Sequence, residues 1–392
     1  MLKKIKISSF KSIFAQEISL GMMNVFIGAN GSGKSNILEA IGVLSAAGGG
    51  RVDDEALQRR GIRLGTPKLY KSAFEERIPS HIFFEAQTDV AKYSVSLDSP
   101  PINPQPTWRY KTEQLVFNHE EIFSRVLRNI KNQEQGLAAL KLVELDENSE
   151  VACLLNLLRN FAVYTPNTPV LRGIIPDQHT KEPVGLSGGR LAEAIKELQN
   201  LVDKSEFIED AFEDILSLID WAGSFDTTYS VSTILSSSVA RPRKVIRFTD
   251  RFMQGKNNYL TAYDASEGAL YILFCAVLAL LPSSPKCLAI DNLDQTLNPR
   301  LILNLTRLLC KWITESNDRR QIFVTVHNPA VLDGLSLQDV RIRLFTVDRN
   351  NRGHTEVSRV VITKELLELS KEKGWPLSRL WVMGHLGGVP NV

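Results

Sequence analysis

An eight-residue segment, Gly28–Ser35 (GANGSGKS), sets the class of fold open to this chain. It has a glycine, four variable residues and then Gly-Lys-Ser, which is the pattern of a phosphate-binding loop. The residues before it, Met23–Ile27, are apolar and predict a buried strand. The residues after it, 36–41, have the apolar spacing of a helix. This context excludes a chance glycine-rich turn and predicts an α/β fold built around a nucleoside triphosphate site.

The chemistry of such a loop explains its residues. Glycines let the backbone curl so that successive N–H groups point at phosphate oxygens, and the helix N-terminus adds its positive dipole end. Lys34 is expected to reach the β- and γ-phosphates, and Ser35 to ligate Mg²⁺. The cofactors expected are therefore ATP and Mg²⁺. The residues expected to bind the nucleotide here are Asn30, Gly31, Ser32, Gly33, Lys34, Ser35 and Asn36.

The length and composition of the chain limit its number of domains and the class of protein to which it belongs. A chain of 392 residues is long enough for two or three domain-sized units, and 43% hydrophobic with 23% charged residues is ordinary for globular proteins. The longest apolar run, Ala269–Leu281, is too short to span a bilayer and stops at Pro282. The N-terminus has no long apolar leader. The four cysteines lie far apart and predict reduced, buried thiols. We therefore expect a soluble cytoplasmic protein with no membrane partner.

Charge is unevenly distributed although the net charge is only +2. Residues 119–240 contain 10 basic and 19 acidic residues, a net charge of −9, so the rest of the chain carries +11. If the protein binds DNA, we expect the flanking regions to supply the phosphate contacts, because that affinity is mainly electrostatic. A well-solvated acidic insertion is the equally weighted alternative.

The pattern along the chain predicts three units: an N-terminal lobe at 1–118 with the phosphate loop, an acidic and mainly helical insertion at 119–240, and a C-terminal lobe at 241–392. The first is rich in strands, among them 3–7, 17–20, 82–84 and 92–97. Helical spacing is expected over 120–161 and 190–221, and residues 100–106 are too rich in proline for a strand. No heptad pattern is sustained, so no long coiled-coil arm is expected.

Three segments in the C-terminal half of the sequence predict the rest of the nucleotide site. Cys287–Asp291 is an apolar strand that ends in a carboxylate, as a Mg²⁺-binding Walker B strand does. Gln321–His327 is a second apolar strand, and its histidine is placed to sense the γ-phosphate. Upstream, Asp264–Gly268 precedes a long apolar helix and offers a hydroxyl and backbone donors at its N-terminus. Asp291 and His327 are therefore candidate site residues.

These residues resemble the RecF/SMC/OLD-like ATPases of the ABC superclass, often described as AAA-family ATPases. The segments that carry the resemblance are Ile7–Ser12, Gly28–Asn36, Ser266–Gly268, Asp291 with Leu297–Pro299, and His327–Pro329. The resemblance implies a P-loop ATPase head, with a mixed central sheet, an antiparallel N-terminal sheet and a helical insertion. It implies that two heads dimerise around ATP. In that dimer Lys34, Ser35, Asp291 and His327 act in one subunit, and Ser266 and Gly268 face the loop of the other.

The resemblance also suggests accessory positions. Lys11 and Ser12, beside the first strand, are candidates to flank the adenine or ribose. Gln87 is the candidate for the glutamine that contacts the metal in this family. Arg51 and the pair at 59–60 are candidates for a cation that reaches across the dimer, although surface solvation explains them equally well.

One departure from the family pattern bears on catalysis. The family places a glutamate directly after the Walker B aspartate to polarise the attacking water, and this chain has Asn292 there. An amide cannot accept a proton at neutral pH, so general-base chemistry from that position is lost. Asp294 and His327 are the remaining candidate bases. We expect ATP binding with weak turnover, and hydrolysis stays open.

A second motif is similar to a nucleotide-binding signature but lies at a different place in the sequence. Leu186–Arg190 (LSGGR) is similar to the Leu-Ser-Gly-Gly-Gln signature of transporter ATPases, but it lies about a hundred residues before Asp291. The signature helix normally leads directly into the Walker B strand, and Ser266–Gly268 has that position. We interpret Leu186–Arg190 as a turn that starts a helix.

The resemblance favours a DNA-linked switch that forms a homodimer or higher homo-oligomer and controls a separate effector, such as a nuclease, in bacterial phage defence. Two alternatives stay open: a non-catalytic, ATP-stabilised scaffold that sequesters an effector, and a RecF-like repair ATPase. A transporter ATPase is disfavoured by the missing signature and by the large insertion. The segment after Val340 predicts one strand pair and a helix, too little for a nuclease domain.

Overall fold

The computed structural model describes residues 1–74, 78–98, 107–126, 132–142, 144–146, 149–229, 244–255, 257–363, 366, 368 and 372–386. The proline-rich loop expected at 100–106 lies outside the described residues. So do residues 230–240 of the expected insertion and residues 387–392 at the C-terminus.

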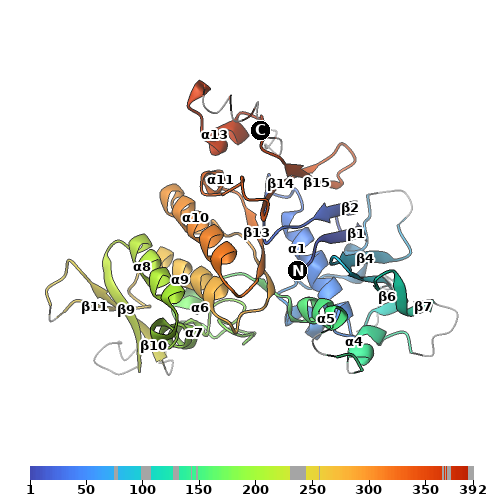
Figure 1. The fold of residues 1–392 in the computed structure, drawn as a ribbon, viewed down its shortest axis with the longest axis horizontal. Helices are drawn as coiled ribbons and strands as arrows, with labels where there is room; N and C mark the ends of the chain where they lie inside the picture. The colour runs from blue at the N-terminus through green and yellow to red at the C-terminus, as the bar shows by residue number, and fades with distance from the viewer. Residues whose placement is uncertain are drawn as a thin grey trace.

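A six-stranded mixed sheet forms the centre of the molecule (Figure 1), with the order β15-β14-β3-β13-β12-β8. All neighbours in it pair in parallel except β15, which returns antiparallel to β14. This confirms the expected mixed central sheet and puts the strand before the phosphate loop at its middle. The strands are β3 (Met23–Ile27), β8 (Val163–Tyr164), β12 (Cys287–Ile290), β13 (Gln321–Val326), β14 (Ile342–Arg349) and β15 (Thr355–Val360).

The central sheet separates two hydrophobic cores. Alternate residues of β3 enter different cores, with Phe26 in the first and Val25 in the second, as the period-two geometry of a strand requires. Val324 and Phe323 of β13 divide in the same way. Because both faces are covered there, β3, β12 and β13 read as continuous apolar runs, which is why they could be recognised in the sequence.

A second, antiparallel sheet packs against the first core, with the order β2-β1-β4-β5-β6-β7. It confirms the expected N-terminal sheet. One expectation is wrong, because residues 120–126 form a strand and not the start of a helical run. They pair with β6, where Arg125 is buried against Glu113. The strands are β1 (Lys4–Phe10), β2 (Ile13–Ser19), β4 (Ile82–Gln87), β5 (Ala91–Asp98), β6 (Arg109–Phe117) and β7 (Glu120–Val126).

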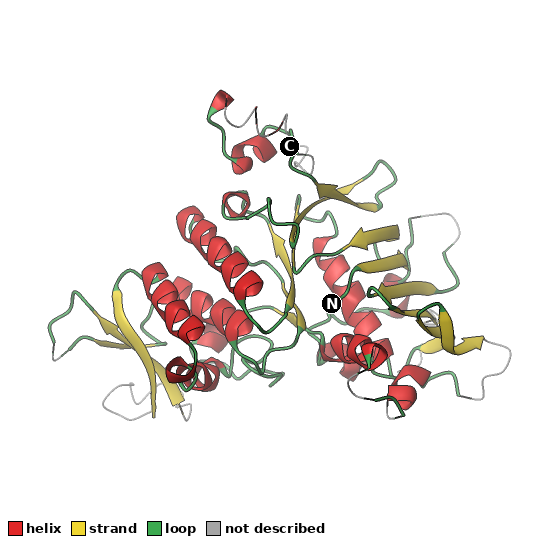
Figure 2. Ribbon diagram, in the orientation of Figure 1, coloured by secondary structure: helices red, strands yellow, loops and turns green. Residues whose placement is uncertain are grey.

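Helices cover both faces of the central sheet (Figure 2). On the side of the antiparallel sheet lie α1 (Lys34–Gly48) and α5 (Glu150–Asn160), whose buried residues join that core. On the other side lie α7 (Leu191–Gln199), α8 (Glu206–Leu218), α9 (Glu267–Leu280) and α10 (Pro299–Glu315). Shorter helical segments are α2 (Asp54–Gln58), α3 (Pro67–Tyr70), α4 (Leu137–Leu142), α6 (Thr168–Leu171), the 3-10 turn η2 (Val202–Lys204), α11 (Ala330–Asp333) and α13 (Leu377–Val382).

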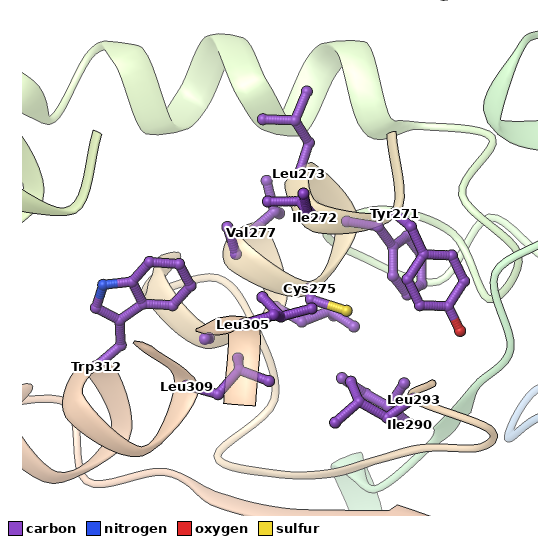
Figure 3. Packing of buried hydrophobic residues seen from close by; sticks show 14 of the residues in the cluster. Tyr271, Ile272, Leu273, Cys275, Val277, Ile290, Leu293, Leu305, Leu309 and Trp312 are labelled. Carbon is purple, nitrogen blue, oxygen red and sulfur yellow. The ribbon is translucent and has the colours of Figure 1, made fainter. Parts of the chain in front are cut away.

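Helix α9 is the centre of the second core. Every residue from Ala269 to Leu280 is buried, so it needs no polar face. Figure 3 shows how its side chains meet the Walker B segment and α10. The labelled residues that pack there are Tyr271, Ile272, Leu273, Cys275, Val277, Ile290, Leu293, Leu305, Leu309 and Trp312. The N-terminus of α9 is therefore exposed, while the rest of the helix packs against the segment around Asp291.

A three-stranded sheet of order β11-β10-β9 lies at the far end of this helical layer (Figure 1). Its strands are β9 (Ala222–Tyr229), β10 (Lys244–Asp250) and β11 (Tyr259–Thr261). The helical run expected over 190–221 is two helices, because the chain turns through η2 between α7 and α8.

Smaller expectations can also be compared with the structure. Cys275, Cys287 and Cys310 are buried free thiols, but Cys153 is exposed, because it lies on the outer side of α5. The segment after Val340 contains the strand pair β14–β15 and helix α13. No helix in the described part of the chain is both long and apolar enough to cross a membrane.

Candidate functional site

The phosphate loop joins β3 to α1, as its sequence predicts. Gly33 is the N-cap residue of α1 and has a φ of 107°, a conformation that favours glycine. A Cβ atom at Gly33 would lie 2.1 Å from Oγ1 of Thr355, and one at Gly28 would lie 2.1 Å from the carbonyl oxygen of Val347. Both glycines are therefore needed because β14 and β15 press against the loop. Asn30 and Gly31 are exposed on its outer side.

Lys34 is a buried cation without an anionic hydrogen-bond partner in the described structure. Its side chain is 5% exposed, and Nζ donates to the carbonyl oxygens of Gly28 (2.7 Å) and Ala29 (2.9 Å). Burial lowers the pKa of Lys34 to about 8, and the carboxylates of Asp294 and Asp291 oppose that shift. A bound phosphate would supply the negative charge that this ammonium lacks, so the residue fits its expected role.

Ser35 meets the Walker B aspartate directly. Its hydroxyl lies 3.1 and 3.0 Å from the two carboxylate oxygens of Asp291 and donates to them. Thr325, fully buried on β13, also donates its hydroxyl to Asp291. A hydroxyl facing a carboxylate is an all-oxygen donor set, which is what Mg²⁺ prefers. The structure thus brings together two of the three expected metal residues.

Asn292 is held on all sides. Its φ is 56°, in the left-handed region that asparagine tolerates better than most residues. Its backbone N–H donates to the Thr325 hydroxyl (2.8 Å), and its carbonyl accepts from the Tyr271 hydroxyl (2.7 Å). Its side-chain oxygen lies 3.1 Å from Nε2 of His327. Position 292 is therefore set by α9, β13 and the histidine together.

Asp294 anchors the segment that follows β13. One carboxylate oxygen accepts from the backbone N–H groups of His327 (2.8 Å) and Asn328. The other oxygen is buried and has no hydrogen-bond partner among the described residues. Burial, with the positive charge of Lys34, lowers the pKa of His327, so the imidazole is neutral at pH 7. Asp294 and His327 thus lie together beside Asp291, as a pair of candidate bases should.

An ion-pair network flanks α1. Lys11, which has a φ of 48°, pairs with the buried carboxylate of Glu39, one turn after Ser35. Arg63 pairs with the other oxygen of Glu39 at 2.6 Å. Its pKa is raised chiefly by its hydrogen bond to Glu39, and the charge of Asp291 adds to that effect. Arg63 was not a sequence candidate, and the charged Glu39 inside an apolar helix was the available signal.

A hydroxyl chain fixes the other side of the loop. Ser12 and Thr355 share a hydrogen bond of 2.7 Å, and the Asn36 amide donates to Ser12 at 2.7 Å. Thr355 also bonds the carbonyl of Ser32 at 2.8 Å. Ser12 and Asn36 are thus in the site, but both side chains are engaged within the protein. Ser32 keeps a buried hydroxyl with no partner among the described residues.

Ser266 lies at a helix start. It is exposed, and its hydroxyl caps α9 by accepting from the Ala269 N–H (3.4 Å). A Cβ atom at Gly268 would only touch Leu297 and Leu301. No hydrogen bond that the described residues form joins Ser266 to the phosphate loop. The link from α9 to the Walker B segment is made by Tyr271, whose hydroxyl bonds the Asn292 carbonyl, and not by Ser266 itself.

Gln87 is the one site candidate that the structure places elsewhere. It ends β4 and pairs with Lys4 at the start of β1, whereas Lys11 follows the other end of β1. Seven residues of extended chain correspond to about 20 Å. Because β4 runs antiparallel to β1, its last residue is carried away from the loop. Gln87 is therefore not a metal ligand of this site within one chain.

Two further sequence features are resolved by their contacts. Leu186–Arg190 is a turn held by Asp177, whose carboxylate accepts from the backbone N–H groups of Ser187 and Gly189. It leads into α7, as expected for a helix start. Of the arginine candidates, Arg51 pairs with Asp53 in its own chain. It follows the far end of α1, about 22 Å of helix from Lys34.

The chain is similar to known proteins in its sequence pattern and in its fold. A family model described as "AAA domain, putative AbiEii toxin, Type IV TA system" matches residues 23–333. No curated protein matches the chain.

Solved structures similar to the chain are heads of SMC proteins. An SMC head bound to the C-winged helix domain of ScpA is 13% identical with a TM-score of 0.50, and the match covers 93% of this chain and 99% of that one. An SMC head with an extended coiled coil, bound to the C-terminal domain of ScpA and derived from Pyrococcus furiosus, is 11% identical with a TM-score of 0.50, over 95% and 99%. An SMC head domain from Thermotoga maritima is 15% identical with a TM-score of 0.44, over 92% and 99%.

Proposed function

The chain belongs to this AAA-domain family and has the fold of an SMC head, and from that premise we propose that it is an ATP-driven switch with slow turnover. The phosphates of ATP would be held by the backbone of the phosphate loop and by Lys34. Mg²⁺ would be held by Ser35 and Asp291. The bound metal supplies neutralisation of phosphate charge. The observation that carries the proposal is the buried ammonium of Lys34, which bonds only carbonyl oxygens.

Slow turnover follows from position 292. The side chain there is an amide whose oxygen faces His327, so it cannot take a proton from water at neutral pH. The two remaining candidate bases are each engaged in other hydrogen bonds. Asp294 accepts from two backbone N–H groups, and His327 bonds Asn292. A nucleotide that persists in the site suits a switch better than a fast motor.

Dimerisation is the proposed output of ATP binding. Ser266 is exposed at the start of a 14-residue buried helix, so it is free to approach a phosphate on a second copy. Helix α9 would then transmit contact at Ser266 to Asn292, because Tyr271 on the same helix bonds the Asn292 carbonyl. In this proposal the lobes at 1–118 and 241–392 form the head, to which β7, α5 and β8 also contribute, and the rest of residues 119–240 is an insertion.

The proposed partner is a separate effector protein, such as a nuclease. The SMC heads similar to this chain are bound to domains of ScpA, and the family description names a toxin of a toxin–antitoxin system. Both favour control of another protein, and we place the role in bacterial phage defence with DNA as the trigger. A non-catalytic scaffold that uses ATP only for stability is the second candidate, and Asn292 is the observation that favours it.

Steady-state and single-turnover ATP hydrolysis on the purified chain, with and without DNA, tests the proposal. Slow turnover that DNA changes supports the switch. Tight ATP binding with no turnover in either condition supports the scaffold. Rapid turnover by the unmodified chain would contradict both.

A further inference from the structure

A basic cleft lies away from the nucleotide site. It has a volume of about 450 Å³ and is open to solvent. Its lining residues come from three places in the sequence: the turn after α2, the end of α5, and the segment before the cis peptide that precedes Pro183. They include Arg59, Arg60, Arg159, His179 and Lys181. None of the described residues that line it is acidic.

Two of these cations have no carboxylate partner among the described residues. Arg159 is exposed at the end of α5, and Lys181 is half-buried. The nearest acidic side chain along the chain, Glu182, pairs with Arg190 instead. Arg59 does pair with Glu55, but both side chains are about 70% exposed, and such pairs contribute little. The cleft is therefore positively charged and uncompensated.

Arg60 forms the floor of the cleft. Its guanidinium donates to the Ser45 hydroxyl (2.7 Å) and to three backbone carbonyls, one of them that of Arg159 (3.2 Å). Burial, together with the charges of Arg159 and Arg59, lowers the pKa of Arg60 to about 10. Burial also lowers the pKa of Lys181 to about 8, with the charge of Arg60 contributing. These like charges repel one another, and a bound anion would reduce that repulsion.

The cleft is on the opposite edge of the central sheet from the phosphate loop. Val163, the first residue of β8, donates its N–H to the Arg60 carbonyl, so Arg60 lies at the amino end of this parallel strand. The phosphate loop leaves the carboxyl end of β3. A larger cavity of about 850 Å³ shares Asn160 and Lys181 with the cleft. Two of its cations are paired, Lys3 with Asp89 and Lys286 with Asp318, and its lining includes carboxylates. The lining of the basic cleft, by contrast, contains no carboxylate among the described residues.

We propose that this cleft, built from Arg59, Arg60, Arg159 and Lys181, is a second binding site for phosphate groups. The exposed guanidinium groups of Arg59 and Arg159 present donors in a planar fork that matches phosphate oxygens, Arg60 adds positive charge from the floor, and Lys181 adds a point charge. The shared chemistry is a phosphate anion, which either a nucleic-acid backbone or a free polyphosphate can supply. The site contains no residue of the nucleotide site, so it stands independently of ATP binding.

The test compares two charge-matched double variants of the full chain. Arg159→Glu/Lys181→Glu reverses the charge of the cleft, and Lys204→Glu/Arg307→Glu reverses two exposed cations elsewhere. Fluorescein-labelled duplex DNA is titrated by anisotropy at several salt concentrations. Inorganic tripolyphosphate is titrated by calorimetry in a Lys34→Ala background, so that the phosphate loop does not contribute. Circular dichroism and melting curves establish folding, and Arg159→Gln/Lys181→Gln replaces the cleft variant if that variant fails to fold.

Each outcome decides the proposal. A loss of DNA affinity of about tenfold or more in the cleft variant alone, with a salt slope reduced by about 1–2, identifies a nucleic-acid backbone. Loss of tripolyphosphate binding in the cleft variant alone identifies a free phosphate ligand. Equal affinities of the cleft and control variants for both probes overturn the proposal. Failure of ATP binding, by contrast, would concern Lys34 and leave these comparisons unchanged.

Discussion

Nε2 of His327 lies 3.1 Å from the side-chain oxygen of Asn292. Because an amide oxygen only accepts, the imidazole must donate from Nε2, and its free lone pair is on Nδ1. Neither group in this contact can therefore act as the base: the amide does not take a proton at neutral pH, and Nε2 already carries one. The backbone at Asn292 is also left-handed, which gives asparagine a conformational reason to occupy the position.

Asn292→Glu should raise single-turnover ATP hydrolysis by about 10²- to 10⁴-fold, since a positioned general base contributes on that scale. The left-handed backbone should make the variant less stable by about 1 kcal/mol. Rapid-quench measurement of ADP formation tests the rate, and a melting curve tests the stability.

Asn292→Asp is the matched comparison, because it adds a carboxylate on a shorter side chain that tolerates the same backbone. A gain with glutamate but not with aspartate would show that reach matters. An unmodified chain that already matches the glutamate variant would show that Asn292 does not restrain hydrolysis.

Lys34→Ala should weaken ATP binding by about 100-fold or more, because hydrogen bonds to charged groups contribute about 1.5–3 kcal/mol each. Isothermal titration in the presence of Mg²⁺ measures the change. Lys204→Ala, an exposed lysine in η2, should leave the affinity unaltered. Equal affinities of the Lys34 variant and the parent chain would refute the assignment of the nucleotide site.

ATP affinity should also depend on pH through Lys34. Its pKa is lowered to about 8 by burial, and a bound phosphate raises it again, so binding requires the protonated ammonium. Affinity should be nearly constant below pH 8 and fall above it, by up to about tenfold per pH unit. Titrations from pH 6.5 to 9.5 in buffers of different ionisation enthalpy should show proton uptake on binding at the alkaline end. Proton release there would contradict the assignment.

Ser266→Arg should abolish ATP-dependent dimerisation while the monomer stays folded. The residue is exposed, so the new side chain projects into solvent, and loss of the cap costs about 1 kcal/mol. Ser205→Arg places the same side chain at the N-cap of α8 and should dimerise normally. Light scattering with ATP and Mg²⁺ measures the mass of both. A dimer of full mass in the Ser266 variant would rule out the trans role.

Thr325→Val should destabilise the chain by about 1–3 kcal/mol, because a buried N–H at Asn292 loses its acceptor and Asp291 loses a donor. Mg²⁺-dependent ATP affinity should fall with it. Thr346→Val is the control on β14, where the hydroxyl makes only a 3.4 Å contact. Denaturant unfolding of both variants distinguishes the two positions, and equal losses would show that the hydroxyl of Thr325 has no special role.

Local pattern was enough to predict the residues with a fixed place in a motif. Lys34, Ser35 and Asp291 were identifiable because a strand, a loop and a helix must follow one another around them, and the structure brings them together. The apolar strands of the central sheet were readable because both their faces are buried. Residues 120–126 were misread because only Arg125 among them is buried, so no alternating apolar pattern marks the strand.

Contacts between distant segments could not be read from the sequence. Arg63 reaches Glu39 only because the chain turns back along α1, and Thr355 reaches Ser32 across 323 residues. The basic cleft shows the same limit. Two of its cations lie inside the segment whose net charge is −9. A count of charges along that segment therefore does not reveal the positive cleft that forms when the chain folds.

Because the hydroxyl of Thr355 supports the phosphate loop, the loop reaches its final shape only after a segment much later in the sequence has been made. Strand β14 borders β3, and Thr355 at the start of β15 supports the loop, yet residues 342–360 leave the ribosome long after the loop itself. A nascent chain that ends before them has a strand and a helix but an unsupported loop between them. Nucleotide capture should therefore wait until β14 and β15 have been translated, so a product truncated before residue 342 would lack the switch instead of being locked in one of its states.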